Sequence, residues 1–189
     1  MRVIARIGTE GSSFTKKELQ MLRYAALLHK VAGGAPKAKE IMRRLKFDNE
    51  TTDMVVRLVD AHEQYIPLTD SHPDNLAAMR HMMHRRGPDL MELLFELQRA
   101  DCLAEPGDAQ EHRLVNLAKT EDLYREVTTR GDCVSLKELA LNGKDLIALG
   151  AEPGKELGIL LEKLLEDVLN APEKNTKEYL SEHVKKFLT

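Results

Sequence analysis

The sequence predicts an all-α protein, a multi-helix bundle, on three observations. Aromatic residues make up only 4% of the 189 residues and tryptophan is absent, whereas β-rich folds lean on aromatic and β-branched side chains. Hydrophobic residues reach 42% and charged residues 31%, which is typical of a soluble globular chain that buries a core. Apolar residues recur at helical spacing in residues 50–62, 90–101 and 157–169, which favours helices packed through leucine, alanine and methionine.

Turn residues and caps place the elements of the first half. Residues 2–7 suit one short strand, which Gly8 and Gly11 would end. Ser13 is a suitable N-cap for the first helix, and Gly33-Gly34 ends that helix. The next helices are expected at 36–46, from Asp48 or Asn49 onward, at 73–86, at 89–104 and at 109–130. The helix at 89–104 is apolar over most of its circumference, so we expect it to be the central buried helix.

The last third has other end signals. The segment 135–138 resembles a capping box, with Glu138 three residues after Ser135. Asn142-Gly143 opens a short helix, and Pro153-Gly154 opens a long one whose leucines form a single stripe up to Leu169. A final amphipathic helix is expected at 175–188.

Charge and cysteine content exclude several classes of protein. Twenty-eight Lys and Arg against 31 Asp and Glu give a net charge of −3, which excludes a global positive field for nucleic acid but leaves a local patch open. Cys102 and Cys133 fit neither a disulfide framework nor a four-ligand zinc site, and suggest a reducing compartment. We find no signal peptide and no apolar run long enough to span a bilayer, so the expected location is the cytoplasm.

Three polar residues lie on apolar helix faces, namely His29, His62 and Asp101. Each is aimed at the core, where a buried polar group needs a hydrogen-bond partner or a metal. They could converge as metal ligands from different helices, or they could be three separately hydrogen-bonded core residues. No His-Glu-x-x-His or Cys-x-x-Cys motif supports the metal reading.

Other chemical motifs are scarce, but two features suit nucleic acid. The chain has no phosphate-cradling glycine loop and no Asp-x-Asp or Glu-x-Asp pair for two-metal nucleotidyl transfer. The helix at 36–46 carries five positive charges against one acid, and a second basic cluster lies at 80–86. Lys144 and Lys155 each follow a glycine that opens a helix, where free N–H groups can hold a phosphate. Solvated basic faces and simple helix entry are the alternative interpretations.

Long segments of the sequence resemble one family. Residues 136–150 and 153–158, continuing to Asn175, resemble the C-terminal portion of bacterial class II tRNA nucleotidyltransferases, the CCA-adding enzymes and their poly(A) polymerase relatives. Ala25 to Lys30 resembles the Ala-Leu-Leu-His-Asp doublet of the HD-type helical domain of that family. Three further segments resemble the family and follow in the same order, namely 43–47, 58–62 and 99–101. The resemblance therefore covers about residues 20–188.

Two departures from the family matter. The doublet here is His29-Lys30, so a cation replaces a metal-binding carboxylate and would repel a metal. We therefore expect no metal, no cofactor and no HD phosphohydrolase activity. His29, His62 and Asp101 would be remnants held by hydrogen bonds, or Lys30 would pair with Asp101 or another carboxylate. The family also catalyses on an N-terminal nucleotidyltransferase head with paired carboxylates, which this chain lacks, so no catalytic residue is expected here.

The resemblance implies an N-terminal segment at 1–12, a degenerate HD-like helical domain at 13–106 and a helical RNA-binding-like domain at 107–189. The implied function is RNA binding, with tRNA as the ligand and with catalysis supplied by a separate head, either removed from this chain or on another one. The alternative is a degenerate HD-domain protein used for protein or small-ligand interaction. The residues expected to bind RNA are Lys37, Arg43, Arg44, Lys144 and Lys155.

Overall fold

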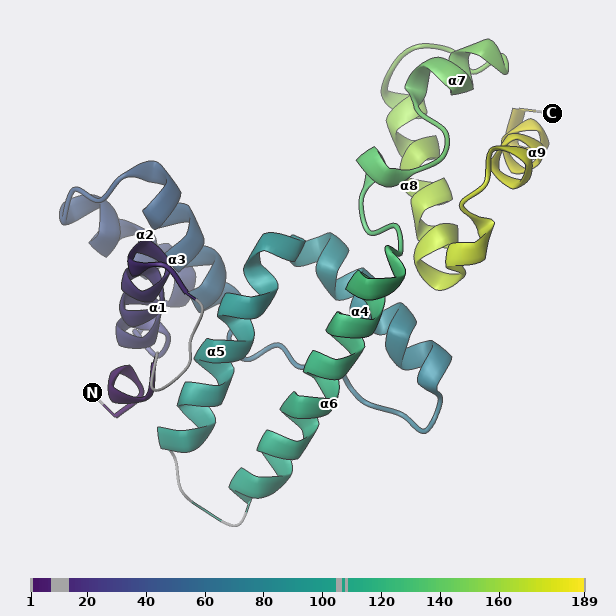
Figure 1. The fold of residues 1–189 in the computed structure, drawn as a ribbon. Helices are drawn as coiled ribbons and strands as arrows, with labels where there is room; N and C mark the ends of the chain where they lie inside the picture. The colour runs from purple at the N-terminus through teal and green to yellow at the C-terminus, as the bar shows by residue number, and fades with distance from the viewer. Residues whose placement is uncertain (1, 8–13, 105–106, 108, 189) are drawn as a thin grey trace. The chain divides into compact units, whose positions relative to one another are not determined.

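The computed structural model describes residues 2–7, 14–104, 107 and 109–188, and within them every regular element is helical, with no strand (Figure 1). This confirms the all-α class. Short 3-10 helices are η1 (Ile4–Arg6), η2 (Leu136–Glu138) and η3 (Pro172–Lys174). In chain order the α-helices are α1 (Lys16–Leu28), α2 (Gly34–Arg44), α3 (Asn49–Ala61), α4 (His72–Arg86), α5 (Pro88–Ala104), α6 (Ala109–Arg130), α7 (Gly143–Ala148), α8 (Lys155–Asn170) and α9 (Lys177–Leu188).

The helices fall into two compact units. The first unit comprises residues 1–66 and 86–122, and the second unit comprises residues 67–85 and 123–189. The expected domains meet at residue 106, whereas the compact units are not continuous in sequence. Residues 67–85 belong to the second unit, and residues 107–122 belong to the first. Helices α4 and α6 therefore each contribute residues to both units.

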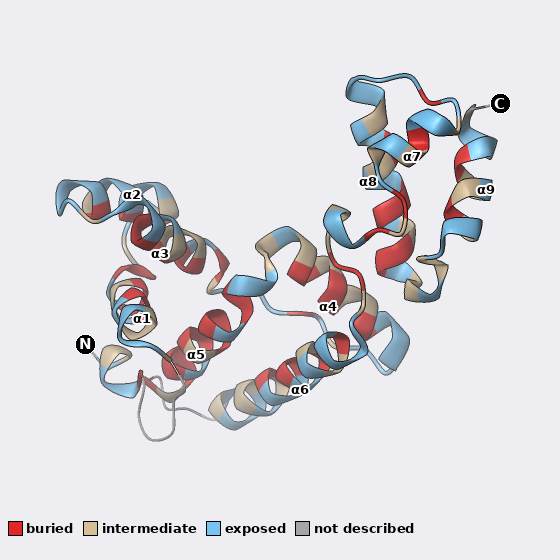
Figure 2. Ribbon diagram, turned by 45° about the horizontal axis from the view of Figure 1, so that its top comes forward, coloured by how far each residue is buried: buried red, intermediate tan, exposed pale blue. Residues whose placement is uncertain are grey.

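Helix α5 is the centre of the first unit. Helices α1 and α3 both pack against α5 and against each other, and α2 packs against α3. Leu90, Leu94 and Leu97 of α5 are fully buried, and buried positions run along most of its length in Figure 2. The apolar circumference of 89–104 predicts this position, and the structure confirms it.

Local caps fix where α1 and α3 begin. Ser13 lies outside the described residues, and Thr15 caps α1 instead, because its hydroxyl accepts from the Glu18 N–H while the Glu18 carboxylate accepts from the Thr15 N–H at 2.7 Å. Asp48 caps α3 by accepting from the Thr51 N–H at 2.9 Å. Both helices thus start at signals that are present in the sequence.

The short strand expected at residues 2–7 is wrong, since Ile4–Arg6 forms η1. A lone strand has no partner among helices and would leave its N–H and C=O groups unpaired. The 3-10 turn supplies local hydrogen bonds, from the Arg6 N–H to Val3 O and from the Ile7 N–H to Ile4 O, while Ile7 is buried. Gly8 and Gly11, which were expected to end the strand, lie outside the described residues.

Arg80 of α4 is the buried charge of the second unit. Its Nε donates to Leu169 O at the end of α8, over 2.6 Å, and its Nη1 lies 2.9 Å from Asp132 Oδ2 just after α6. The arginine is 3% exposed, so this ion pair is shielded from water. Arg80 therefore joins three segments of its unit and is no part of a basic surface.

The helix starts of the second unit match the sequence signals only in part. The capping box expected at Ser135 is wrong, because the Ser135 side chain makes no capping hydrogen bond and Glu138 accepts from the Val134 N–H instead. Only the 3-10 helix η2 follows. At Asn142 a capping box does form, with Asp145 as the reciprocal partner, and α7 begins there.

The two cysteines are free and buried, one in each unit. Burial raises the pKa of the Cys102 thiol and, likewise, that of the Cys133 thiol. Both thiols are therefore protonated and shielded near neutral pH. In the described part of the chain, no helix is both long enough and apolar enough to cross a membrane.

The stripe on α8 gives a direct test of the packing. Leu164 is completely buried, so Leu164→Ala should lower the free energy of unfolding by about 2–5 kcal/mol, measured by urea denaturation. Ile159 lies on the same helix and is 49% exposed, so Ile159→Ala should cost about 0.5 kcal/mol or less. Equal losses in the two variants would contradict the assigned burial.

Candidate functional site

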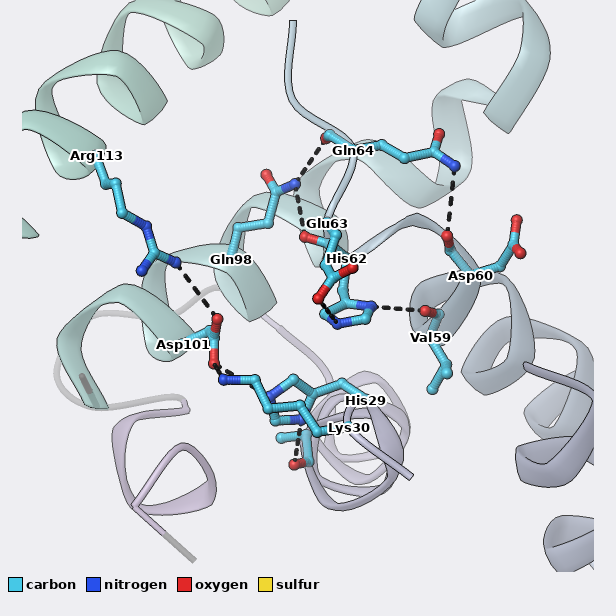
Figure 3. Close-up of polar contacts among 11 residues, drawn as sticks. His29, Lys30, Val59, Asp60, His62, Glu63, Gln64, Gln98, Asp101 and Arg113 are labelled. Atoms are coloured by element: carbon cyan, nitrogen blue, oxygen red, sulfur yellow. Dashed lines mark hydrogen bonds and ion pairs between the residues drawn. The ribbon is translucent and has the colours of Figure 1, made fainter. Parts of the chain in front are cut away.

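His29 and His62 share one local geometry. Each follows the last residue of a helix, His29 after α1 and His62 after α3. In each ring, Nδ1 lies within hydrogen-bond distance of the carbonyl oxygen three residues earlier. The distance is 2.8 Å from His29 to Ala26 O and 2.7 Å from His62 to Val59 O. This contact makes Nδ1 the donor and turns Nε2 away from the helix. The two rings meet edge to face with centroids 5.2 Å apart (Figure 3).

Positively charged or hydrogen-bonding groups contact both carboxylate oxygens of Asp101 on α5. His29 Nε2 lies 3.1 Å and Lys30 Nζ 3.0 Å from the same oxygen, Oδ1. Arg113 of α6 approaches the other oxygen, Oδ2, at 3.5 Å, as Figure 3 shows. The carboxylate is buried, and a buried charge needs such partners to offset its lost hydration. We call His29, Lys30, His62 and Asp101 the His–Lys–Asp cluster.

The partners of Asp101 outweigh its burial. Burial raises the pKa of the Asp101 carboxyl. The hydrogen bond and charge of Lys30, followed by those of His29, together lower this pKa by more than burial raises it. The net pKa lies below the ordinary value of 3.8. Asp101 is therefore ionised at neutral pH, and the two nitrogens of the His29 ring lie next to the acceptors Ala26 O and Asp101 Oδ1.

His62 takes no part in the contacts of Asp101. Its Nε2 is buried without a hydrogen-bond partner and lies 3.6 Å from Glu63 Oε1, beyond a hydrogen bond. Gln98 of α5 positions this turn, because its amide nitrogen donates to both His62 O and Gln64 O. The cluster therefore brings His29, Lys30 and Asp101 into direct contact and leaves His62 beside them.

The cluster does not fit a divalent metal ion. Among the described residues, no group of three or more His, Cys, Asp or Glu side chains is arranged to hold a metal. Asp101 Oδ1, the oxygen that faces His29, is in contact with the Lys30 ammonium. A metal ion there would have to displace Lys30 and would stand next to its charge.

The basic helix α2 presents most of its charges to solvent. Lys37 pairs with Glu40 at 2.8 Å, and this acid is the only one on the helix. Lys39, Arg43 and Arg44 are exposed and make no ion pair with any described residue. Lys39 is not among the residues expected to bind RNA, although its spacing of four from Arg43 places the two on one face.

The two glycine-opened helices differ from expectation. The N–H groups of Lys144 and Asp145 are not free, because both donate to Asn142 Oδ1, at 2.9 and 3.3 Å. The expectation of open N–H groups is therefore wrong at α7. At α8, Gly154 has no side chain to cap the helix before Lys155. Lys144 and Lys155 belong to the second unit, whereas the α2 cations belong to the first.

The second basic cluster, at 80–86, is largely engaged in contacts with other segments of the protein. Arg80 is buried on Asp132, and Arg86 donates to Asp60 and Gln64. His84 contacts Val134 O through Nδ1. These side chains hold helices together, so α2 is the stronger candidate for a nucleic-acid surface.

Lys30→Met should lower stability in a way that depends on pH. The folded pKa of Asp101 lies below 3.8, its unfolded value, so the contribution of the carboxylate is full above that pH and fades as the pH falls further. We expect a loss of about 1 kcal/mol at pH 7 in urea unfolding, the value for a partly solvent-screened pair, and a smaller loss at pH 3. Lys16→Met, at an exposed residue for which the described part of the chain supplies no partner, should change little at either pH. A loss that is the same at pH 3 and pH 7 would contradict the pairing.

The charge of Lys30 also predicts the metal content. Protein purified without chelator should contain far less than one Fe, Mn, Zn or Mg ion per chain by elemental analysis, and chelator should leave its thermal stability unchanged. Stoichiometric metal that is lost in His29→Ala would show that the ammonium does not exclude a metal from the cluster.

Comparison with known families matches residues 16–184 to the family described as tRNA nucleotidyltransferase domain 2 (putative). The matched region runs from the first residue of α1 into α9 and includes the whole His–Lys–Asp cluster. No curated protein and no solved structure gave a significant match. Because the match spans most of the chain, the protein belongs to the tRNA nucleotidyltransferase domain 2 family.

Proposed function

We propose that this chain is the RNA-binding helical part of a tRNA nucleotidyltransferase of the CCA-adding or poly(A) polymerase kind, with tRNA as its RNA. Family membership supports a role in tRNA nucleotidyl transfer. The observation that carries RNA binding is the exposed charge of Lys39, Arg43 and Arg44 on α2, which have no acidic partner among the described residues. The proposal includes the cytoplasm as the location of the protein.

Helix α2 suits a polyanion. Lys39, Arg43 and Arg44 leave three positive charges uncompensated on an 11-residue helix, in a chain whose net charge is −3. Arginine binds phosphate through a planar fork of donors, and each neutralised phosphate releases counterions. Lys37, although paired with Glu40, and Lys144 and Lys155 of the second unit complete the proposed set.

In this proposal the chain does not catalyse by itself. Its sequence has no Asp-x-Asp or Glu-x-Asp pair for two-metal chemistry, and a separate nucleotidyltransferase head supplies that step. The His–Lys–Asp cluster is then a degenerate HD site. Lys30 stands where the family doublet has a carboxylate, and the cluster stabilises the first unit.

A second candidate function is binding of a small ligand by the degenerate HD domain. A cavity of about 450 Å³ lies next to the cluster. Arg2, His29 and Lys30 give it a positive character, and Leu27, which is 58% exposed, gives it an apolar wall. This cavity favours a small anionic ligand with an apolar part.

A tRNA titration at several salt concentrations tests the first function. Affinity should fall with salt at a slope of about −0.9 per phosphate contact. The double variant Arg43→Ala/Arg44→Ala should bind more weakly and flatten the slope by up to about 2 units, with little change in stability.

The matched control is Lys16→Ala/Arg23→Ala, which removes the same charge from exposed positions of α1 that have no described partner. It should bind like the wild type. Absence of binding at low salt, or equal weakening in both double variants, would favour the small-ligand function instead.

A further inference from the structure

A small cavity lies between α2 and α3 in the first unit. It has a volume of about 210 Å³ and is lined by Lys39, Arg43, Asn49, Thr52, Asp53 and Val56. Pockets for whole small molecules usually measure about 300–1,000 Å³. The cavity is therefore smaller than the usual site for a whole nucleotide and has room for one phosphate group with a few waters.

The α2 side of the cavity carries two positive charges. Lys39 and Arg43 are four residues apart, so they share one helix face and repel each other. Neither makes an ion pair with a described residue, and Glu40 is already held by Lys37 at 2.8 Å. Lys39 and Arg43 thus both line the cavity, and no described carboxylate forms an ion pair with either of them.

The α3 side supplies a buried hydroxyl without a partner. Thr52 is 5% exposed, and its Oγ1 is buried with no hydrogen bond in the structure. Buried polar atoms in folded proteins nearly always have a partner, so an unsatisfied one needs an explanation. Asn49, at the first position of α3, adds an amide donor to the same lining.

One acid lines the cavity and opposes an anion there. Asp53 lies 3.8 Å from Arg57 Nη1, but the closer partner of Arg57 is Asp89, at 2.8 Å. Arg57 would therefore stay in place if the Asp53 charge were removed. This makes Asp53 a useful probe, because its loss should improve anion binding.

We propose that the α2–α3 cavity binds a phosphate group of RNA, held by the charges of Lys39 and Arg43 and by hydrogen bonds from Thr52 and Asn49. The proposal rests on RNA binding as the function of the chain, and it adds a specific phosphate position. The same chemistry would accept free inorganic phosphate, so the experiment uses both sources.

The full chain, labelled with ¹⁵N, is titrated separately with tRNA and with inorganic phosphate, and the amide signals of Asn49, Thr52 and Val56 are followed. Thr52→Val removes a hydroxyl that has no internal partner, so it should keep the thermal stability of the wild type. It should weaken tRNA binding about tenfold without changing the salt slope, because a hydrogen bond to a charged group is lost but no charge.

Two charge variants and a control complete the set. Lys39→Ala should weaken tRNA binding and flatten the salt slope by about 0.9. Asp53→Asn should tighten binding about two- to fivefold, a gain that damage to the fold does not produce. Arg23→Ala, on an exposed residue of α1 that has no partner among the described residues, should match the wild type.

The outcomes separate this proposal from the proposed function. Binding of tRNA that ignores Thr52→Val, Lys39→Ala and Asp53→Asn would overturn the phosphate site and leave RNA binding standing. Shifts of the three amides with inorganic phosphate but not with tRNA would support the site, with free phosphate as its ligand, and contradict the RNA function. No shifts with either ligand would overturn the site.

Discussion

The first unit depends on how the charge of Asp101 is compensated inside it. A carboxylate on the central helix α5 is buried, and its stability there requires positively charged or hydrogen-bonding partners from other segments. His29 and Lys30 come from the end of α1, and Arg113 comes from α6. The contact therefore fixes where α1 ends relative to α5. The ion pair with Asp101 also explains how the Lys30 ammonium can lie next to the two histidines, because the carboxylate balances its charge.

The second unit uses the same principle with the charges reversed. There the buried group is the Arg80 guanidinium, which is held by Asp132 and by the carbonyl of Leu169. Each unit thus contains a buried charge whose loss of hydration is offset by partners from distant parts of the sequence. Removing Asp132 would leave the Arg80 guanidinium buried without an acidic partner among the described residues, which costs more than an ordinary surface ion pair contributes.

The sequence predicts helix positions well because their signals are local. Asp48 and Asn142 lie next to the helix starts that they mark, and the leucine stripe of α8 is visible at a spacing of three and four. The central place of α5 follows from its apolar circumference. Where a local signal was read alone, as at residues 2–7 and at Ser135, the tertiary context overrode it.

The candidate sites could be predicted only in part. The sequence indicates that His29 and Asp101 face the core, but their contact joins residues 72 positions apart. The burial of Arg80 depends on Asp132 and Leu169, so its cluster reads as a basic surface until those partners are placed. The cavity at Lys39 needs α3 beside α2, and the unsatisfied hydroxyl of Thr52 has no signature in a linear sequence.

The placement of the cysteines has a practical consequence. Cys102 and Cys133 are the only two in the chain, and each is buried in a different unit. A thiol reagent can reach either one only when the surrounding helices open. The rate at which each sulfur is modified therefore reports local opening of one unit. The measurement needs no added label and no substitution. Comparing the two rates as RNA is added would reveal which half of the molecule the ligand rigidifies.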